Sequence, residues 1–221
     1  CSRNPLVIDI QDNNIPQGER LGIDYADFLS TGDPKFAWEP PYDEWDALAL
    51  NYTSGTTGNP KGVVLSHRGA YLNSLGNLIA WQMTGKPVYL WTLPMFHCNG
   101  WCFPWSIVAL GGTQVCLRGV NPGEVIDSIY ENKVTHLCGA PILLNMLINA
   151  SPKSLRKIPH GLQVLTAGAP PPAAVIKSCE ALGMVVTQTY GLTEVYGPCV
   201  VSEWDDSWDK LSADERARLK A

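Results

Sequence analysis

The sequence has no dense run of lysine or arginine, no Cys-X-X-Cys pair and no uninterrupted apolar run long enough to cross a bilayer. Its 16 basic and 21 acidic residues give a net charge of −5, which excludes the positive surface that nucleic acids and anionic membranes require. Residues 87–117 carry no charge, but Pro94, Pro104 and several glycines interrupt them, so they indicate buried core. We expect no nucleic-acid partner and no membrane span.

Seven cysteines are scattered along the chain. An odd number without paired spacing argues against a disulfide framework or a zinc site and favours a reducing compartment. We expect the cytoplasm, with the peroxisome as the alternative for a eukaryotic protein, whose C-terminal targeting tripeptide would lie outside this sequence.

Short apolar and β-branched runs alternate with segments of helical period after residue 45. Such alternation predicts the α/β class, with a mostly parallel sheet and helices on both faces. We interpret residues 1–45 as an irregular linker or wrapping arm with a short helix at 25–30, residues 46–200 as the α/β region, and residues 201–221 as the truncated start of a helical segment. Expected strands cover residues 47–52, 88–93, 113–117, 134–138, 163–166 and 185–189; expected helices cover 67–82, 101–110, 122–132, 140–148, 171–182 and 212–220.

A segment rich in glycine and hydroxyl groups follows the first expected strand: Tyr52-Thr53-Ser54-Gly55-Thr56-Thr57-Gly58-Asn59-Pro60-Lys61-Gly62. Glycines let backbone N–H groups approach a ligand and Lys61 adds positive charge, which suits a polyphosphate. Lys61 has the Walker A spacing from Gly55, but Pro60 and Gly62 replace the flanking Gly and Ser/Thr of that motif. The segment therefore predicts a different kind of phosphate loop, and the alternative is a solvated surface turn.

Two further motifs follow, Thr166-Ala167-Gly168-Ala169-Pro170 and Gln188-Thr189-Tyr190-Gly191-Leu192-Thr193-Glu194. With residues 52–62 they resemble, in order and spacing, the motifs of the adenylate-forming (AMP-binding) superfamily, which contains acyl-CoA synthetases, firefly luciferase and peptide-synthetase adenylation domains. The resemblance spans most of the chain. It implies part of the large N-terminal domain of such an enzyme, with ATP, Mg²⁺ and coenzyme A as cofactor and co-substrates.

The resemblance also implies roles for individual residues. A carboxylate that attacks the α-phosphorus of ATP expels pyrophosphate, so cations and oriented donors must neutralise the leaving group. Lys61, Thr193 and Glu194 are the expected catalytic residues, and Glu194, helped by Thr53, is expected to hold Mg²⁺. The residues expected to bind the nucleotide are Thr53, Ser54, Gly55, Thr56, Thr57, Gly58, Lys61, Gly168, Ala169, Pro170, Gln188, Thr189, Tyr190, Gly191 and Thr193. The residue types alone leave two alternatives open: a solvated carboxylate for Glu194 and core packing for Tyr190.

The run Leu93-Pro94-Met95-Phe96-His97-Cys98-Asn99-Gly100-Trp101 follows the second expected strand. A lone histidine in an apolar run is commonly a core residue, but ligands of open α/β sheets lie beyond the carboxyl ends of strands, where this run falls. In the family this region lines the acyl pocket and gates between the half-reactions, so we expect His97 and Trp101 to bind substrate. If residues 97–101 were helical, the two side chains would share a face. The same resemblance makes Gly139, Ala140 and Pro141 a further pocket wall; the alternative is a plain helix start.

The same run narrows the class of carboxylic acid that we expect as substrate. Peptide-synthetase adenylation domains usually carry Asp after the Phe, to hold the substrate ammonium, and this chain has His97 after Phe96. Because a buried ammonium without such a partner is costly, an amino acid is disfavoured. Bulky Trp101, Phe103 and Trp105 would shorten the pocket. Residues 93–105 closely resemble short- and medium-chain acyl-CoA ligases, including the methylmercaptopropionate-CoA ligase type.

These observations predict an acid–thiol ligase that activates a small carboxylic acid to acyl-AMP and transfers it to coenzyme A. The alternatives are a nucleotide-binding fragment without turnover and an adenylate-forming relative with another acceptor. No Thr-Gly-Asp motif for the ribose follows Glu194, since Thr31-Gly32-Asp33 precedes the phosphate loop. We therefore interpret the chain as a central slice of such an enzyme, inactive on its own, whose full-length parent would form a homodimer or act alone.

Overall fold

The structure is a computed structural model that describes residues 5–12, 18–53 and 58–221. Its contacts divide the chain into two compact units, Cys1–Pro40 and Pro41–Ala221. The first unit contains a parallel pair of two-residue strands, β1 (Ile8–Asp9) and β2 (Ile23–Asp24), and helix α1 (Tyr25–Ser30). The short helix is confirmed. The boundaries expected after residues 45 and 200 stay predictions.

The second unit is built on a six-stranded sheet of order β10-β9-β8-β7-β5-β6. Five strands run parallel: β5 (Val88–Trp91), β6 (Thr113–Cys116), β7 (His136–Gly139), β8 (Leu162–Thr166) and β9 (Met184–Leu192). The mostly parallel α/β sheet is therefore confirmed. Strand β10 (Gly197–Val201) lies antiparallel on β9 at the edge, and the sequence analysis missed it because Pro198 cannot donate a ladder hydrogen bond and so speaks against a strand.

The expected strand over residues 47–52 exists but does not join the parallel sheet. It is β3 (Ala47–Thr53), which pairs antiparallel with β4 (Lys61–Ser66) in a separate two-stranded sheet. The expectation was wrong because a short connection suffices for an antiparallel partner, whereas a parallel partner needs a long crossover. The sequence analysis ended the loop segment at Gly62 and assigned no element to residues 63–66, whereas residues 61–66 form the second strand of this hairpin.

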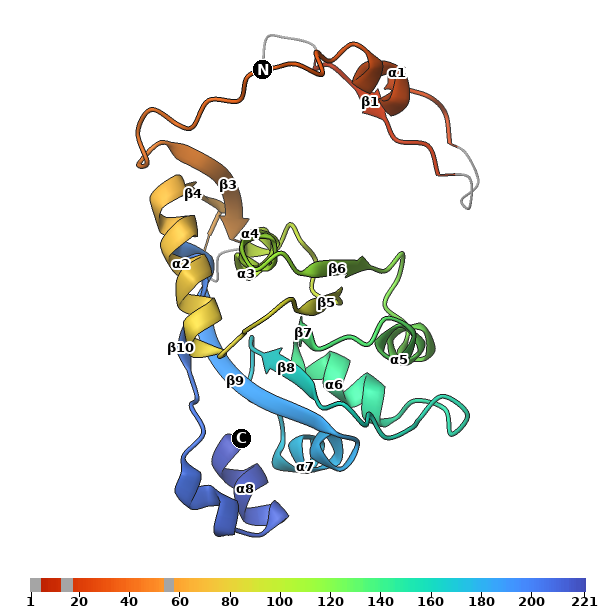
Figure 1. Ribbon diagram of the computed structural model, residues 1–221, viewed down its shortest axis with the longest axis vertical. Helices are drawn as coiled ribbons and strands as arrows, with labels where there is room; N and C mark the ends of the chain where they lie inside the picture. The colour runs from red at the N-terminus through yellow and green to blue at the C-terminus, as the bar shows by residue number, and fades with distance from the viewer. Residues whose placement is uncertain (1–4, 13–17, 54–57) are drawn as a thin grey trace. The chain divides into compact units, whose positions relative to one another are not determined.

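Helices cover both faces of the sheet, as expected (Figure 1). On one face Tyr89, Trp91 and Leu165 pack with residues of and beside α2 (His67–Ala80) and α4 (Phe103–Ala109); a short element, α3 (Cys98–Trp101), precedes α4. On the other face Leu90 and Val164 pack with α5 (Pro122–Glu131), α6 (Pro141–Ile148) and α7 (Ala173–Ala181). The alternation of neighbouring residues between two clusters is the period of two that a strand imposes.

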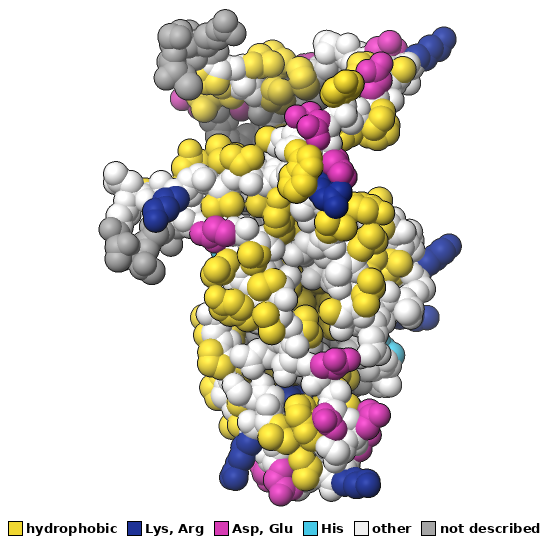
Figure 2. All heavy atoms as spheres, turned by 90° about the vertical axis from the view of Figure 1, so that its left-hand side faces the viewer, with side chains coloured by type: hydrophobic (Ala, Val, Ile, Leu, Met, Phe, Trp, Pro, Cys, Tyr) yellow, Lys and Arg dark blue, Asp and Glu magenta, His cyan; other side chains and the backbone are white. Residues whose placement is uncertain are grey.

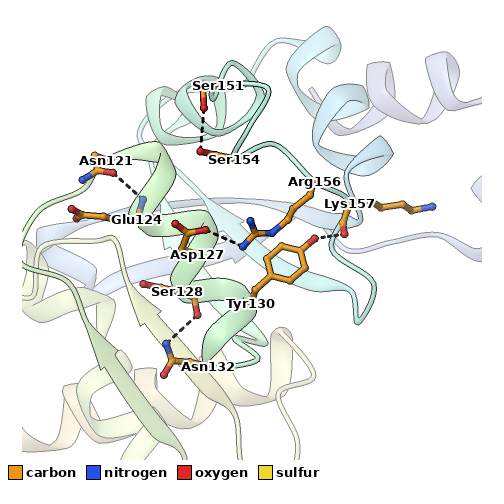
Figure 3. Close-up of polar contacts among 10 residues, drawn as sticks. All are labelled: Asn121, Glu124, Asp127, Ser128, Tyr130, Asn132, Ser151, Ser154, Arg156 and Lys157. Carbon is orange, nitrogen blue, oxygen red and sulfur yellow. Dashed lines mark hydrogen bonds and ion pairs between the residues drawn. The ribbon is translucent and has the colours of Figure 1, made fainter.

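Surface contacts fasten the segments between these elements. Arg156, which precedes β8, places its guanidinium 2.9 Å from an Asp127 carboxylate oxygen and 4.1 Å from the centre of the Tyr130 ring, both on α5 (Figure 3). After β10, the 3₁₀ turn η2 (Asp206–Lys210) leads to α8 (Ala213–Lys220), which begins with a capping box formed by Ser212 and Glu215. No helix among the described residues is long and apolar enough to span a membrane.

Helix α2 buries two polar side chains and exposes several apolar ones. Ser74 and Asn77 are buried, whereas Leu72 and Ile79 are 51% and 78% exposed. Hydrophobic side chains accordingly gather on the side of the molecule that α2 forms (Figure 2). This is the reverse of the usual surface helix, whose apolar stripe faces the core. The buried polar side chains of this helix therefore need hydrogen-bond partners.

Candidate functional site

The strand order changes direction at β5. The chain passes from β5 to its neighbour β6 and then returns to β7 on the other side of β5. Connections leave the two sides of such a strand toward opposite faces of the sheet, and a crevice forms beyond its carboxyl end. Residues 92–97 leave β5 at this point, so the topology itself places His97 beside a crevice.

A cavity of about 590 Å³ lies there. Its described lining comes from four places in the sequence: the β3–β4 hairpin, the segment after β5, the end of β8, and the segment from the end of β9 to β10. The lining residues are Thr53, Gly58, Lys61, His97, Cys98, Trp101, Ala167, Gly168, Gly191, Leu192, Thr193, Glu194, Gly197 and Pro198. Residues that lie up to 145 positions apart in sequence thus share one cavity.

The structure brings residues from several of the expected motifs into this one cavity. The phosphate segment contributes Thr53, Gly58 and Lys61, and the two downstream motifs contribute Gly168, Gly191, Thr193 and Glu194, while His97 and Trp101 come from the expected acid pocket. Ser54, Gly55, Thr56 and Thr57 lie outside the described residues. The remaining expected residues do not line this cavity: Ala169, Pro170, Gln188, Thr189, Tyr190, Gly139, Ala140 and Pro141.

Some of those remaining residues have other surroundings. Thr189 is buried and donates its hydroxyl hydrogen to the Val200 carbonyl oxygen at 2.6 Å, which fastens β9 to β10. Tyr190 is 60% exposed, so the alternative of core packing is wrong, and its ring is open to a ligand. Pro141 begins helix α6, with Ala140 as the N-cap residue.

The hairpin places Thr53 and Lys61 directly opposite each other. They are register partners at the end of the β3–β4 ladder, where the glycine- and hydroxyl-rich segment connects the strands. Pairing over six positions fixes the two residues on either side of that segment. The lysine is exposed, which leaves its ammonium group free to meet an anion in the cavity.

Residues 98–102 form a left-handed turn. Cys98, Asn99, Gly100, Trp101 and Cys102 have φ values of 45, 44, 57, 57 and 66°. Left-handed backbone costs roughly 1–2 kcal/mol for each residue with a side chain, so surrounding contacts must hold this turn. The condition under which His97 and Trp101 would share a face of a right-handed helix is therefore not met. His97 and Trp101 nevertheless both reach the cavity, His97 exposed and Trp101 buried.

Side chains from neighbouring elements hold the left-handed turn. The side-chain amide of Asn51, on β3, donates a hydrogen to the side-chain oxygen of Asn99 at 2.5 Å. The Cys98 thiol lies 3.0 Å from the Thr193 hydroxyl. Burial raises the pKa of Cys102 to about 12, which keeps this thiol protonated so that it can donate to a backbone carbonyl. The sequence analysis overlooked Asn51 and Cys98 because single polar residues in apolar runs carry no local signal.

The downstream motif ends in a compact turn. The 3₁₀ element η1 (Thr193–Val195) is followed by Tyr196, whose φ is 68°. The Tyr196 hydroxyl oxygen lies 3.1 Å from both the backbone nitrogen and the hydroxyl oxygen of Ser66, at the end of β4. This contact joins the turn that carries Glu194 to the hairpin that carries Lys61.

The charges of the cavity suit a magnesium-bound polyanion. Lys61 supplies a cation and Glu194 the carboxylate among the described lining residues. The described residues contain no cluster of three His, Cys, Asp or Glu side chains. Magnesium commonly takes one or two protein carboxylates and completes its shell with phosphate oxygens and water, so a single glutamate beside hydroxyl groups fits this ion.

Comparisons with known proteins agree with this geometry. A family model described as AMP-binding enzyme matches residues 5–216. The chain is 50% identical over 226 aligned positions to the peroxisomal acetate/butyrate–CoA ligase of Arabidopsis thaliana, covering 99% of this chain and 40% of that protein. It is 49% identical over 209 positions to the 2-methylpropanoate–CoA ligase of Humulus lupulus, covering 95% and 37%.

Two solved structures share the fold. The O-succinylbenzoate coenzyme A synthetase of Bacillus subtilis, in complex with ATP and magnesium ion, gives a TM-score of 0.74 at 25% identity over 92% of this chain and 43% of that chain. The inhibitor-bound N-terminal domain of FACL13 from Mycobacterium tuberculosis gives 0.72 at 30% identity over 80% and 45%. The chain thus spans about 40% of the length of the curated relatives it matches. It belongs to the family of AMP-binding enzymes, in the acyl-CoA ligase branch.

Proposed function

We propose that the protein to which this chain belongs joins a short-chain carboxylic acid to coenzyme A with consumption of ATP. The acid carboxylate attacks the α-phosphorus, the bond to the β-phosphate breaks, and pyrophosphate leaves with the electron pair. The thiol of coenzyme A then attacks the acyl-adenylate and AMP leaves. In this proposal the chain supplies the triphosphate contacts and part of the acid pocket.

One observation carries the proposal: Lys61, Glu194 and His97, from three separate segments, line a single cavity. Pyrophosphate departure concentrates negative charge at one place, and Lys61 at the hairpin end is the cation available to stabilise it. Thr193 would donate its hydroxyl hydrogen to the α-phosphate. Glu194, with Thr53, would hold the magnesium ion, which adds positive charge next to the phosphates.

We further propose that the acid is short. Trp101 is buried and lines the cavity together with His97. An indole ring there limits the depth available to an acyl chain, because close-packed walls cannot expand cheaply. Relatives named as acetate/butyrate– and 2-methylpropanoate–CoA ligases support this size. The peroxisome remains the alternative to the cytoplasm, since one of these relatives is named peroxisomal.

The test is the acid-dependent exchange of labelled pyrophosphate into ATP, measured on the longest natural protein that contains this chain and on the 221-residue chain alone. We expect exchange with acetate or butyrate in the longer protein and none in the chain. In the second half-reaction, a comparison of coenzyme A with another acceptor distinguishes a coenzyme A ligase from an adenylate-forming relative that uses a different acceptor. Absence of exchange in the longer protein with every acid from acetate to decanoate would refute the enzyme proposal.

Two variants of the longer protein sharpen the test. In Lys61→Ala, kcat should fall by about a hundredfold or more, as on loss of a group that stabilises transition-state charge, with a smaller change in the KM for the acid. Lys86→Ala removes another exposed lysine, one that does not line the cavity, and serves as the control. Equal kcat values for the two variants would remove Lys61 from the mechanism.

A nucleotide-binding module without turnover is the second candidate. The chain's coverage of about 40% of its relatives favours it for the isolated chain. Binding of magnesium–ATP to the 221-residue chain, without exchange in the longer protein, would establish this function in place of the first.

A further inference from the structure

Helix α2 carries two asparagines one turn apart on its inner face, Asn73 and Asn77. Asn77 is 6% exposed and Asn73 is half-buried. A buried amide is costly unless both its donor and its acceptor groups are satisfied. Their hydrogen bonds therefore show what the inner face of the helix holds in place.

Asn77 connects the helix to the left-handed turn. Its amide nitrogen donates to the Trp101 backbone carbonyl oxygen at 2.9 Å and to the Asn73 side-chain oxygen at 2.9 Å. In a left-handed turn the carbonyl groups do not continue into a regular ladder, so an outside donor is needed for each buried one. Asn77 is that donor for Trp101.

Asn73 connects the helix to the turn that carries Glu194. Its amide nitrogen donates to the carbonyl oxygens of Val195 and Pro198, each at 3.1 Å. Val195 directly follows Glu194, and Pro198 lies in β10 and lines the cavity. The two amides thus form a continuous hydrogen-bonded path from Trp101, through α2, to the backbone that follows Glu194.

The helix makes this path stiff. Positions four apart on an α-helix have a fixed separation, and the Asn77 amide nitrogen bonds to the Asn73 side-chain oxygen across that separation. Ser74, between them, adds a contact from its hydroxyl to the Cys102 carbonyl oxygen at 3.3 Å. The two turns therefore cannot shift independently without breaking one of these hydrogen bonds.

We propose that Asn73 and Asn77 are positioning residues that hold the Trp101 turn and the Glu194 turn in one register. Neither side chain lines the cavity, so they act through the backbone that they fix. The consequence for catalysis rests on the proposed function: the acid, limited by Trp101, would be aligned with the phosphates near Glu194. The structural coupling itself does not depend on that function.

Hydrogen–deuterium exchange of the 221-residue chain without ligand tests the coupling. The reporters are the amides of Cys102, which donates to Asn99, and Tyr196, which donates to Thr193. In Asn77→Leu, which keeps the branching of the side chain and removes the donor, deuterium exchange should rise by about tenfold at both reporters, the effect of losing one buried hydrogen bond. The milder Asn73→Ala should raise exchange at both as well and keeps the test valid if the leucine variant does not fold.

The matched control is Asn145→Ala. Asn145 and Asn149 form a similar amide pair four residues apart, at 3.2 Å, but on the exposed surface of and beside α6. In this control, deuterium exchange at both reporter amides should stay unchanged. A rise confined to one reporter, or no rise, in a folded Asn77→Leu or Asn73→Ala variant would overturn the proposal.

Kinetics of the longer protein add a second measurement. Misalignment of two bound substrates should lower kcat in the pyrophosphate-exchange reaction by about tenfold or more, with a smaller change in the KM for ATP, whereas loss of a simple stability contact would leave kcat per folded molecule unchanged. If the parent protein shows no pyrophosphate exchange, the proposed function fails. Hydrogen–deuterium exchange alone then decides the positioning role. If the parent is active and both variants keep the parent's kcat, the positioning role is refuted.

Discussion

Acidification should destabilise this protein through one buried histidine. His136 begins β7, is 9% exposed, and packs its ring against Trp81 at a centroid distance of 4.9 Å. Its Nδ1 lies 2.7 Å from the Thr135 hydroxyl oxygen. Burial lowers the pKa of His136 from 6.5 to about 4, because the charged imidazolium loses its hydration.

The sign and size of the effect follow from this pKa. Between pH 6.5 and about 4 the unfolded chain binds a proton at this histidine and the folded chain does not, so the free energy of unfolding falls as the pH falls. At about 1.4 kcal/mol per pKa unit, the loss amounts to roughly 3 kcal/mol. The contribution is complete above pH 6.5 and absent below about pH 4.

Urea unfolding followed by tryptophan fluorescence at several pH values measures this loss. His136→Asn, which keeps a polar group near the Nδ1 position, should flatten the dependence of the free energy of unfolding between pH 6.5 and about 4 by most of this loss of roughly 3 kcal/mol. His160→Asn removes a histidine from the exposed surface and is the matched control. If the two variants and the wild type share one pH dependence, the burial argument is refuted.

Two pairs of glycine substitutions test the packing of the site by the same unfolding assay. Gly100→Ala places a Cβ 2.8 Å from a buried indole ring at a φ of 57°, so it should cost about 1–3 kcal/mol more than Gly111→Ala, which has a φ of 60° and no neighbour within 4 Å. Gly69→Ala meets the Tyr196 ring at 2.0 Å and should be destabilising, whereas Gly76→Ala on the same helix meets nothing within 4 Å and should stabilise by up to about 1 kcal/mol. Equal effects within either pair would contradict the packing described.

Much of the fold was predictable from local patterns. The segments over residues 88–93 and 163–166 alternate between two environments, and Asn121 and Ser212 mark helix starts by capping. Such signals act over a few residues. The expectation of a phosphate site rests on the same kind of local signal, since the glycines, the hydroxyl groups and Lys61 lie within one run of eleven residues.

The remaining features depend on contacts between distant segments. The left-handed backbone of Asn99 and Trp101 is held by partners 48 and 24 positions away. The polar inner face of α2 makes sense only beside the turns to which it donates. Such pairings have no local signal, because each residue type taken alone is compatible with a surface position.

The amino-acid sequence by itself determined the order of motifs, the alternation of strands and helices, and the residue types that suit a triphosphate. Only the tertiary structure decided that β3 pairs with β4 instead of joining the sheet, that residues 98–102 turn left-handed, and that Lys61, His97 and Glu194 line one cavity. The reason is physical: local propensities act between near neighbours, whereas a cavity is formed where hydrogen-bonding and packing requirements of several distant segments are satisfied together.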